Sequence, residues 1–395
     1  MTTSHERWNT IHTTYTESVS TNVLSEDQLT KIDELVLNED IEHIHNGLTL
    51  LTTLAPEYLC RYLKQDGESV VLRDAGRFCN ALLAERALVN AVKGEPMWQG
   101  LFESGAFESM HFRSLGDVSV ENLTADEKSF CVRMAKEMVL IPKGDFMMGG
   151  LEDDEDADDI EKPRHKVTLT RDFLMGKYPV TQALWESVMG SNPSHFKGAN
   201  RPVETVSWLD VVAFGNKLSE REGLEPVYSG LGGYQLSHKF GDEDWLGNSK
   251  KATKLSKKIS VSATANGYRL PTEAEWEYSA RANQSFKYSG SDNVDEVAWY
   301  DDNSGYETHP VGQKKPNGFG LYDMSGNVAE WVWDWYGDYS SQSDSDLVGP
   351  NRGLYRVYRG GSWNHFAGYA RISTRYEDCP DLERRDLGFR PGRTT

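Results

Sequence analysis

The sequence predicts an α+β protein built from two dissimilar parts. Before about residue 120, apolar residues recur every three or four positions, which is typical of amphipathic helices. From Met138 onward the apolar runs are short, long polar stretches separate them, and nine of the 11 tryptophans occur there. We therefore expect an N-terminal tail over 1–23, a small helical domain over 24–120, and a larger domain with little regular secondary structure over 137–392.

The composition excludes several classes of protein. The 42 Lys and Arg residues against 61 Asp and Glu residues give a net charge of −19, so no nucleic-acid partner is expected, because binding to phosphates needs clustered cations. The sequence lacks a run of about 18 apolar residues, so no membrane span is predicted, and its start lacks the features of a secretory signal. The scattered cysteines indicate free thiols and a cytoplasmic location. They are Cys60, Cys79, Cys131 and Cys379.

Local signals place several helices in the N-terminal part. Ser25 opens the motif SEDQ, a capping box with Gln28 that predicts the start of a helix. Asn38 is the candidate cap of the next helix, and Pro56 suits the first turn of another. The stretch 78–92 has helical spacing and is followed by a glycine and a proline, which predicts a fourth helix that ends there.

Three helices and one aromatic strand are predicted inside the larger domain. Thr181 and Ser207 precede amphipathic stretches, and Thr272 forms a capping box with Glu275. In the motif EWVWDWY the tryptophans alternate at two-residue spacing, which predicts a strand with one aromatic face turned to the core. These tryptophans are Trp331, Trp333 and Trp335.

Two charged stretches interrupt the larger domain. The run EDDEDADDIE, residues 152–161, is predicted to be a solvated loop, with metal capture as the alternative. Residues 226–264 are polar and locally basic. We expect them to form a surface insertion.

The larger domain contains a series of recognisable blocks in a fixed order: MVLIPKGDFMMGG, YRLPTEAEWEYSARA, HPVGQKKPNGFGLYDMSGNVAEWVWDWY, YRVYRGGSWN and LGFRP. Over about residues 137–392 these blocks resemble the formylglycine-generating (sulfatase-modifying factor) family. The resemblance implies a C-type-lectin-like fold for this domain. The helical part lies outside it.

The motif DMSGNVAEW is the best candidate for a metal site. Asp323 and Glu330 supply hard carboxylate oxygens on either side of a turn, and calcium prefers such ligands. The resemblance implies a structural calcium ion held by these two side chains and by the backbone carbonyls of Gly326 and Val328. The alternative is a capped turn held by hydrogen bonds.

Enzymes of the resembling family oxidise a sulfatase cysteine to formylglycine, and they bind copper(I) through two cysteines just after the GGSW block. Copper(I) is a soft ion and requires such thiolates. Here no cysteine occurs from Gly360 to Asp378, and Cys379 stands alone. No copper is therefore expected, and the family's catalytic residues are not carried over. An oxidase with altered ligands remains the alternative.

A second group of relatives, the ergothioneine-type sulfoxide synthases, binds iron through histidines contributed largely by an N-terminal helical domain. The helical part here offers His43 and His45. Two residues that are two positions apart on a helix diverge by about 200° and do not share a face. We expect both histidines to face solvent.

The C-terminal segment 360–390 resembles instead the variable proteins of diversity-generating retroelements, whose frame reads RGGSWN…AG…AR…S.R….PD..R…LGFRP. The resemblance implies a non-catalytic, receptor-like protein in which residues between the frame positions contact a protein or another macromolecule. The helical domain would contact a partner of its own. The expected ligand-binding residues are His365, Phe366, Tyr369, Tyr376, Asp378, Leu382, Arg384 and Asp386.

Overall fold

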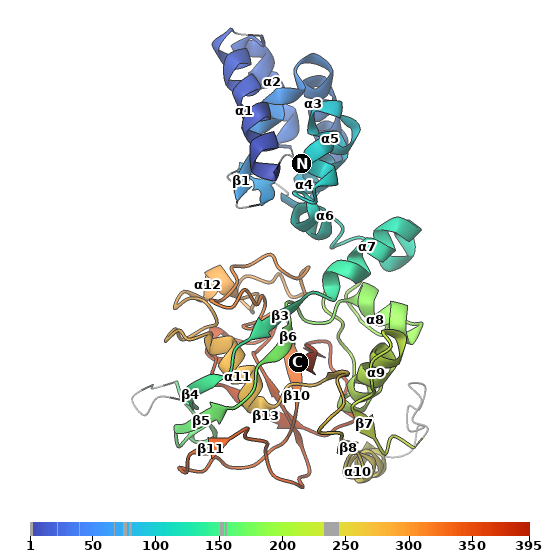
Figure 1. Ribbon diagram of the computed structural model, residues 1–395, viewed down its shortest axis with the longest axis vertical. Coiled ribbons are helices and arrows are strands. Elements are labelled where there is room, and N and C mark those ends of the chain that lie inside the picture. The colour runs from blue at the N-terminus through green and yellow to red at the C-terminus, as the bar shows by residue number, and fades with distance from the viewer. Residues whose placement is uncertain are drawn as a thin grey trace. The chain divides into compact units, whose positions relative to one another are not determined.

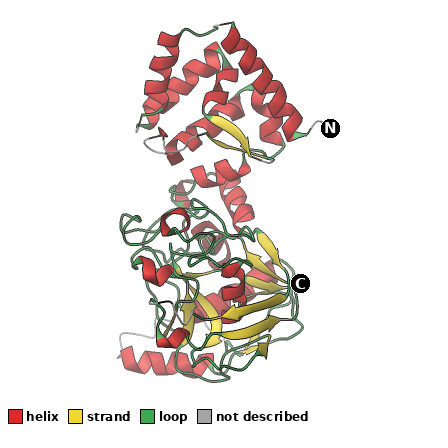
Figure 2. Ribbon diagram, turned by 90° about the vertical axis from the view of Figure 1, so that its left-hand side faces the viewer, coloured by secondary structure: helices red, strands yellow, loops and turns green. Residues whose placement is uncertain are grey.

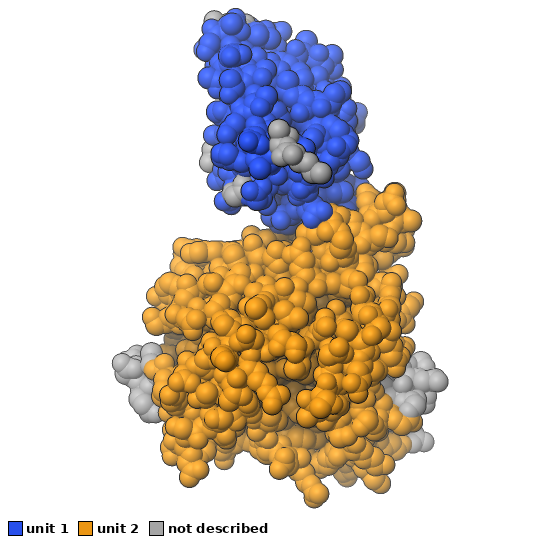
Figure 3. Space-filling view, in the orientation of Figure 1, with its two compact units in different colours: residues 1–116 blue, residues 117–395 orange. Residues whose placement is uncertain are grey.

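The computed structural model divides into two compact units, residues 1–116 and residues 117–395 (Figure 3). In the part of the chain that the structure describes, no helix has the length and apolar character needed to cross a membrane. The described residues are 3–21, 23–38, 40–66, 68–73, 77–78, 81–150, 154, 156–232 and 245–395.

The first unit is helical, as the sequence predicts, and it also contains a small antiparallel hairpin. Apolar side chains from its helices form one core. Its elements are α1 (Ser4–Ser20), α2 (Glu26–Val36), α3 (Ile41–Leu54), the 3₁₀ helix η1 (Pro56–Arg61), β1 (Leu63–Asp66), β2 (Ser69–Leu72), α4 (Ala81–Gly94), α5 (Pro96–Glu103) and α6 (Glu108–Ser114).

The prediction of an N-terminal tail is wrong, because α1 occupies most of that stretch. A capping box starts the helix: the hydroxyl of Thr3 accepts from the backbone N–H of Glu6, and the Glu6 carboxylate accepts from the backbone N–H of Thr3. Trp8 and Ile11 are buried, and the Trp8 ring meets that of Trp98 edge to face at 6.0 Å. The apolar stripe of α1 is short and interrupted by Thr and Ser, so its periodicity is weak.

The predicted N-cap is confirmed for α2, but the N-cap of α3 is a different residue from the one predicted. Ser25 and Gln28 form the predicted capping box of α2. Asp40, and not Asn38, caps α3, because the Asp40 carboxylate accepts from the backbone N–H of Glu42 at 2.7 Å. The amide oxygen of Asn38 instead accepts from the backbone N–H of Asp40 at 2.9 Å. The turn led by proline is η1, and the last predicted helix is α4.

The second unit combines short strands, short helices and long connections, which is the mixed architecture that the sequence predicts (Figure 2). Its helices are η3 (Val120–Asn122), α7 (Ala125–Ala135), η4 (Asp159–Glu161), α8 (Gln182–Met189), α9 (Trp208–Arg221), α10 (Trp245–Ser256), α11 (Glu273–Arg281), α12 (Val294–Val297) and η5 (Ala367–Ala370). Its strands are β3 (Met138–Ile141), β4 (Gly144–Met148), β5 (His165–Leu169), β6 (Phe173–Gly176), β7 (Tyr228–Ser229), β8 (Ser260–Val261), β9 (Tyr268–Arg269), β10 (Ala329–Trp335), β11 (Asp344–Ser345), β12 (Arg356–Arg359), β13 (Arg375–Asp378), β14 (Leu387–Phe389) and β15 (Gly392–Thr394).

Two four-stranded sheets bring distant parts of this unit together. One has the order β13-β12-β10-β14, in which β10 is antiparallel to β12 and parallel to β14. The other has the order β3-β6-β15-β9, so the last strand of the chain pairs with two earlier strands. Helices α8 and α9 lie side by side along the unit (Figure 1). The part of the chain from β12 to β15 thus contributes strands to both sheets.

The predicted helices of this unit start where the sequence indicates. Side-chain oxygens accept from the first-turn backbone of α8, α9 and α11, and they belong to Thr181, Ser207 and Thr272. The motif EWVWDWY forms β10, as predicted. Trp331 and Trp335 are buried, but Trp333 keeps part of its surface exposed.

The acidic stretch differs from the prediction, whereas nothing in the described part of the basic stretch contradicts it. Part of the acidic stretch 152–161 lies outside the described residues, but Glu161 is fully buried and Asp154 is half-buried. Both pair with Arg371, so the solvated-loop prediction is wrong for these two residues. The basic stretch 226–264 also lies partly outside the described residues, and the rest includes α10 with its exposed lysines.

The described cysteines form no disulfide. Burial raises the pKa of the Cys60 and Cys131 thiols to about 12. Cys379 is half-buried, and Cys79 lies outside the described residues. At these pKa values the two buried thiols are protonated near neutral pH and are poor nucleophiles or metal ligands.

Candidate ligand-binding surface

A double glycine turns the chain at the start of the C-terminal segment. Gly360 and Gly361 have φ angles of 95° and 67°, a region that glycine adopts without strain. A Cβ atom at Gly361 would lie 2.7 Å from the backbone oxygen of Tyr369. The chain can therefore leave β12, pass through η5 and return as β13, which is antiparallel to β12.

Buried ion pairs tie this segment to the rest of the unit. Four arginines of the predicted frame are at most 3% exposed, and each donates to a glutamate that is also buried. The glutamates come from α11, β10 and the acidic stretch. Removing one partner of such a pair typically costs about 3–5 kcal/mol, since it leaves an uncompensated buried charge. The pairs are Arg359–Glu277, Arg371–Glu161, Arg375–Glu273 and Arg390–Glu330.

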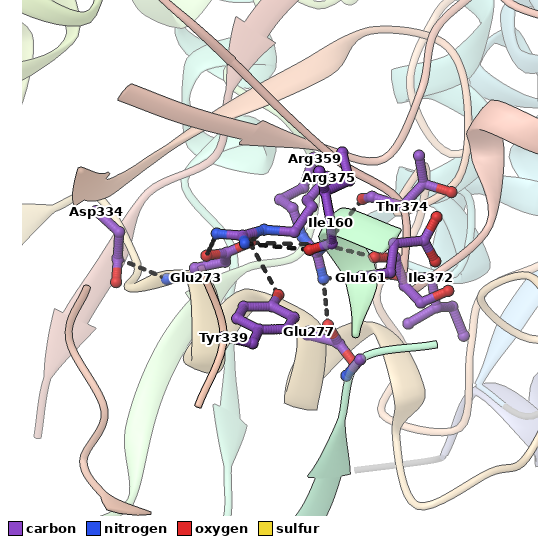
Figure 4. Close-up of polar contacts among 12 residues, drawn as sticks. Ile160, Glu161, Glu273, Glu277, Asp334, Tyr339, Arg359, Ile372, Thr374 and Arg375 are labelled. Atoms are coloured by element: carbon purple, nitrogen blue, oxygen red, sulfur yellow. Dashed lines mark hydrogen bonds and ion pairs between the residues drawn. The ribbon is translucent and has the colours of Figure 1, made fainter. Parts of the chain in front are cut away.

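Two of these pairs share a network with Tyr339 and Asp334 (Figure 4). Glu273 accepts from Nε and Nη2 of Arg375 at 2.8 Å each, and from the hydroxyl of Tyr339 at 3.1 Å. The Arg375 guanidinium also lies over the Tyr339 ring, 4.0 Å from its centroid. Asp334 accepts from the backbone N–H of Glu273 at 2.7 Å. Burial, assisted by the charge of Glu273, raises the pKa of Asp334 to about 7.

Four side chains of the segment form one aromatic patch, defined as His365, Phe366, Tyr369 and Tyr376. The ring centroid of Tyr369 lies 5.5 Å from that of His365, 6.5 Å from that of Phe366 and 5.6 Å from that of Tyr376. Phe366 is 67% exposed and Tyr369 is 40% exposed. Exposed aromatic side chains held by fixed neighbours are well suited to contact a partner.

An ion pair lies beside the aromatic patch. Arg384 donates to both carboxylate oxygens of Asp386, with Nε 2.8 Å from Oδ1, and its Nη1 donates to the hydroxyl of Tyr358 at 3.2 Å. Nε2 of His365 lies 3.6 Å from Oδ2 of Asp386. Burial lowers the pKa of His365, so its ring is neutral near pH 7. Asp386 itself is only 3% exposed, so the structure turns this predicted contact residue towards Arg384 and His365 and not towards solvent.

The two remaining predicted contact residues lie further along the segment. Asp378 of β13 is half-buried; burial raises the pKa of its carboxyl group, and Arg384 opposes that rise. Leu382 is half-buried in a turn that its backbone N–H closes on the carbonyl of Cys379 at 3.0 Å. Six of the eight predicted residues thus form one connected group. Asp378 interacts with this group only electrostatically, through the positive charge of Arg384.

Sequence reasoning missed three aromatic residues around the patch. The ring of Tyr358 in β12 stacks on that of Tyr376 at 5.5 Å. Trp363 is half-buried, its Nε1 donates to the carbonyl of Arg385 at 3.0 Å, and Phe196 meets its ring edge to face at 5.1 Å. Tyr358 and Trp363 belong to the block YRVYRGGSWN, so the sequence alone could have indicated them. Only the fold brings Phe196 to them.

The predicted calcium ligands are buried in the turn before β10 and at the start of that strand. Glu330 accepts from Arg390 through both oxygens and from Nε1 of Trp276 at 2.6 Å. Asp323 accepts from the backbone N–H of Gly312 at 2.8 Å, and burial raises its pKa to about 6. The two residues predicted to supply carbonyls are also buried, and they are Gly326 and Val328.

This turn fits a calcium ion poorly. Both carboxylates already accept hydrogen bonds from the protein, and the guanidinium of Arg390 would repel a cation bound at Glu330. The contacts favour the alternative, a turn held by hydrogen bonds. Calcium binding here stays a prediction.

The described residues offer no soft-metal centre at this surface. Within the described ranges, no three His, Cys, Asp or Glu side chains gather as metal ligands would. The segment contains the single thiol of Cys379, whereas a two-thiolate copper site needs a second one. His43 and His45 of α3 are both exposed, as predicted.

The small sheets, long connections and buried arginine frame define a C-type-lectin-like domain of the formylglycine-generating type, with a helical region before it. The chain belongs to the family described as the sulfatase-modifying factor enzyme 1-like domain, whose model matches residues 124–394.

Several known proteins share this domain. Chaperone protein LppX of Paenibacillus barcinonensis is 40% identical over 227 residues, which are 52% of this chain and 74% of that protein. The formylglycine-generating enzyme of Thermomonospora curvata is 30% identical, over 65% of this chain and 93% of its own length. The chain also matches the serine/threonine-protein kinase pkn1 of Chlamydia pneumoniae at 31% identity, but it spans only 37% of that protein. Among solved structures, Treponema denticola variable protein 1 superposes with a TM-score of 0.57 at 37% identity, covering 65% of this chain and 95% of that one.

Proposed function

We propose that this protein is a non-catalytic, receptor-like binding protein that displays a diversified C-terminal surface on its C-type-lectin-like domain. The observation that carries the proposal is a contrast within residues 360–390. The frame arginines are buried in ion pairs, whereas Phe366 and Tyr369 of the aromatic patch extend into solvent. The likeness to a variable protein of Treponema denticola supports the same function.

The energetics of substitution support diversification at the exposed positions. Surface substitutions away from buried contacts usually change stability by about 0.5 kcal/mol or less. Substitution of a frame arginine should reduce stability several times more, because each frame arginine carries a buried charge that pairs with a buried glutamate. The segment can therefore change its exposed side chains while β12, β13 and β14 keep their course.

The chemistry of the surface suits a macromolecular partner. Aromatic rings and arginine contribute most of the binding energy at protein interfaces. Here Arg384 is already neutralised by Asp386, so the surface offers aromatic contact and hydrogen bonding without a strong net charge. We infer that a protein, or another macromolecule with an apolar face, binds to the aromatic patch and to the side chains beside it.

An oxidation assay tests whether the protein is catalytic. The purified chain is loaded with copper(I) and incubated in air with a cysteine-containing sulfatase peptide, and the peptide is analysed by mass spectrometry. We expect the peptide cysteine to remain unchanged. Conversion to formylglycine above the level of free copper would overturn the proposal of a non-catalytic protein.

The second candidate function is oxidation of a protein cysteine at a copper site whose ligands differ from those of the family's enzymes. Membership of the family favours this candidate. This alternative requires stoichiometric copper binding that depends on Cys379. The matched variant is Cys379→Ser, which keeps size and removes the thiol. Equal metal binding and equal peptide oxidation by parent and variant would remove this role for Cys379.

A further inference from the structure

A pocket in the second unit shares no residue with the aromatic patch. Its volume is about 600 Å³, within the usual range for small-molecule sites. It lies where β4, β5, β10, β13 and the first turn of α11 meet the connection from 337 to 351. The charged side chains of its lining, together with one histidine, are His165, Glu273, Asp334, Asp338, Asp344 and Arg375.

The lining contains four carboxylates and one guanidinium. The guanidinium of Arg375 donates to both oxygens of Glu273, at 2.8 Å each (Figure 4). Its remaining terminal nitrogen donates to the carbonyls of Gly337 and Ile160, at 2.8 and 3.3 Å. Arg375 therefore compensates the charge of Glu273 and has no nitrogen left for the other carboxylates.

The other three carboxylates form no ion pair with any residue that the structure describes. Asp334 and Asp344 accept hydrogen bonds from backbone N–H groups, which carry no net charge. Asp338 has no hydrogen-bond partner in the described ranges. The buried Arg356 attracts Asp334 at longer range, without an ion-pair contact. The pocket thus carries excess negative charge, which favours a cationic ligand.

A buried histidine presents an open hydrogen-bond acceptor to the same pocket. His165 is 3% exposed, and its Nδ1 lies 3.0 Å from the carbonyl oxygen of Pro163. Because a carbonyl only accepts, Nδ1 carries the proton of the neutral ring and Nε2 is an acceptor. Within the described part of the chain Nε2 has no partner, yet it is not sealed from solvent. A buried acceptor in this situation requires a donor from outside the chain.

The uncompensated carboxylates lie at two depths. Asp334 is 2% exposed, as deeply buried as His165, whereas Asp338 and Asp344 are exposed at the mouth of the pocket. Leu347 adds apolar surface to the lining, against which methylene groups can pack. Negative charge at both ends of one pocket suits a ligand with two separated positive charges.

We propose that this pocket binds a small linear diamine. One ammonium group donates to Asp334 and to Nε2 of His165, since an ammonium group has three donors. The methylene chain packs on the apolar part of the lining, and the second ammonium group pairs with Asp338 and Asp344. This binding is independent of the macromolecular contact proposed for the aromatic patch, because the two sites have no residue in common.

Three matched ligands test the requirement for two charges. 1,4-Diaminobutane carries two ammonium groups, 1-aminobutane carries one, and 1,4-butanediol carries none. Each is titrated into the full chain by calorimetry at low ionic strength. The titrations are done at pH 8, because burial raises the pKa of Asp334 to about 7 and its carboxyl group is largely ionised at this pH.

Three variants test the residues. Asp338→Asn combined with Asp344→Asn removes both exposed carboxylates of the pocket, and Asp334→Asn removes the buried one. Asp302→Asn removes an exposed carboxylate elsewhere and serves as the matched control. Thermal melts show whether each variant is folded. The double variant changes only exposed side chains, so it tests the proposal even where Asp334→Asn lowers the melting temperature.

We expect the parent to bind one diamine molecule, to bind 1-aminobutane about tenfold more weakly, and not to bind the diol. The double variant should bind the diamine about tenfold more weakly than the parent, as for the loss of two partly exposed ion pairs. Asp334→Asn should bind the diamine no better than 1-aminobutane, and Asp302→Asn should bind all three ligands as the parent does.

Three results would overturn the proposal. The first is absence of diamine binding by the parent. The second is an equal effect of the double variant and of Asp302→Asn, which would show nonspecific attraction by the net charge of −19. The third is equal affinity for 1-aminobutane and the diamine. Since 1-aminobutane reproduces a lysine side chain, this last result would indicate a lysine of a partner protein as the occupant.

Discussion

The guanidinium of Arg359 donates to the carboxylate of Glu277, and both side chains are completely buried. Arg359 also donates to the carbonyls of Ser373 and Thr374, each at 2.8 Å, and Figure 4 shows it between Glu277 and Thr374. One side chain therefore connects the last residue of β12, helix α11 and the approach to β13. The C-terminal segment leaves the sheet and returns to it around this contact.

Replacing Arg359 should destabilise the second unit strongly. Arg359→Met leaves Glu277 with Arg281 as its remaining cation and leaves several carbonyls without a donor, so we expect a loss of about 3–5 kcal/mol in the free energy of unfolding. Urea denaturation at pH 7 measures this change. Arg352→Met, at an exposed position, should cost less than about 0.5 kcal/mol. Equal losses in the two variants would show that the ion pair does not hold the segment.

The exposed rings should be replaceable without loss of the fold. Phe366→Ala and Tyr369→Ala remove side chains that are 67% and 40% exposed, so we expect each to change the free energy of unfolding by less than about 1 kcal/mol. Thermal melts of the variants and parent provide the measurement. A drop of several kcal/mol at either position would mean that the patch is structural, and it would remove the physical basis for diversification.

Asp334 should make stability depend on pH. Its pKa is raised from 3.8 to about 7 by burial, so the folded state binds a proton more tightly than the unfolded state does. The contribution of this group to stability is therefore complete below about pH 4 and is lost as the pH rises towards 7. Urea denaturation of the parent and of Asp334→Asn from pH 4 to 8 isolates the effect. The stability of the parent relative to the variant should fall over this interval, and a constant difference would contradict the assignment.

Calcium provides a test of the buried segment 323–330, which contains Asp323 and Glu330. A ligand that binds only the folded state stabilises it by about 2.7 kcal/mol at a hundredfold excess over its Kd. Because Arg390 already occupies Glu330, we expect equal melting temperatures in millimolar calcium and in chelator. An increase of several degrees in calcium, lost in Asp323→Asn, would instead establish the cation site that the sequence predicts.

The sequence predicts those parts of the fold that depend on neighbouring residues. The capping boxes at Ser25 and Thr272 are local, and both form as expected. The N-cap of α3 was predicted at Asn38 but is Asp40. Both residue types can cap a helix, so the local sequence does not decide between them. Helix α1 was not predicted from the sequence, because few apolar residues form its buried face and its helical periodicity is therefore weak.

The frame of the candidate site depends on distant contacts, and the sequence does not indicate them. Glu161 and Arg371 are 210 residues apart, and the acidic run around Glu161 looks like a solvated surface. The eight predicted contact residues could be proposed because they lie in one segment with a recognisable frame. Phe196 could not, since only the folded chain brings it to the ring of Trp363.

The central claim is that residues 360–390 form a diversified binding surface. The most direct measurement is to sequence the DNA that encodes this segment and the next few kilobases. We predict a near-copy of the coding segment that differs from it only where the copy has adenine, with a reverse transcriptase gene close by. If the region holds no such copy, the claim of diversification is contradicted, and the chain is to be regarded as a family member that lacks the cysteine pair.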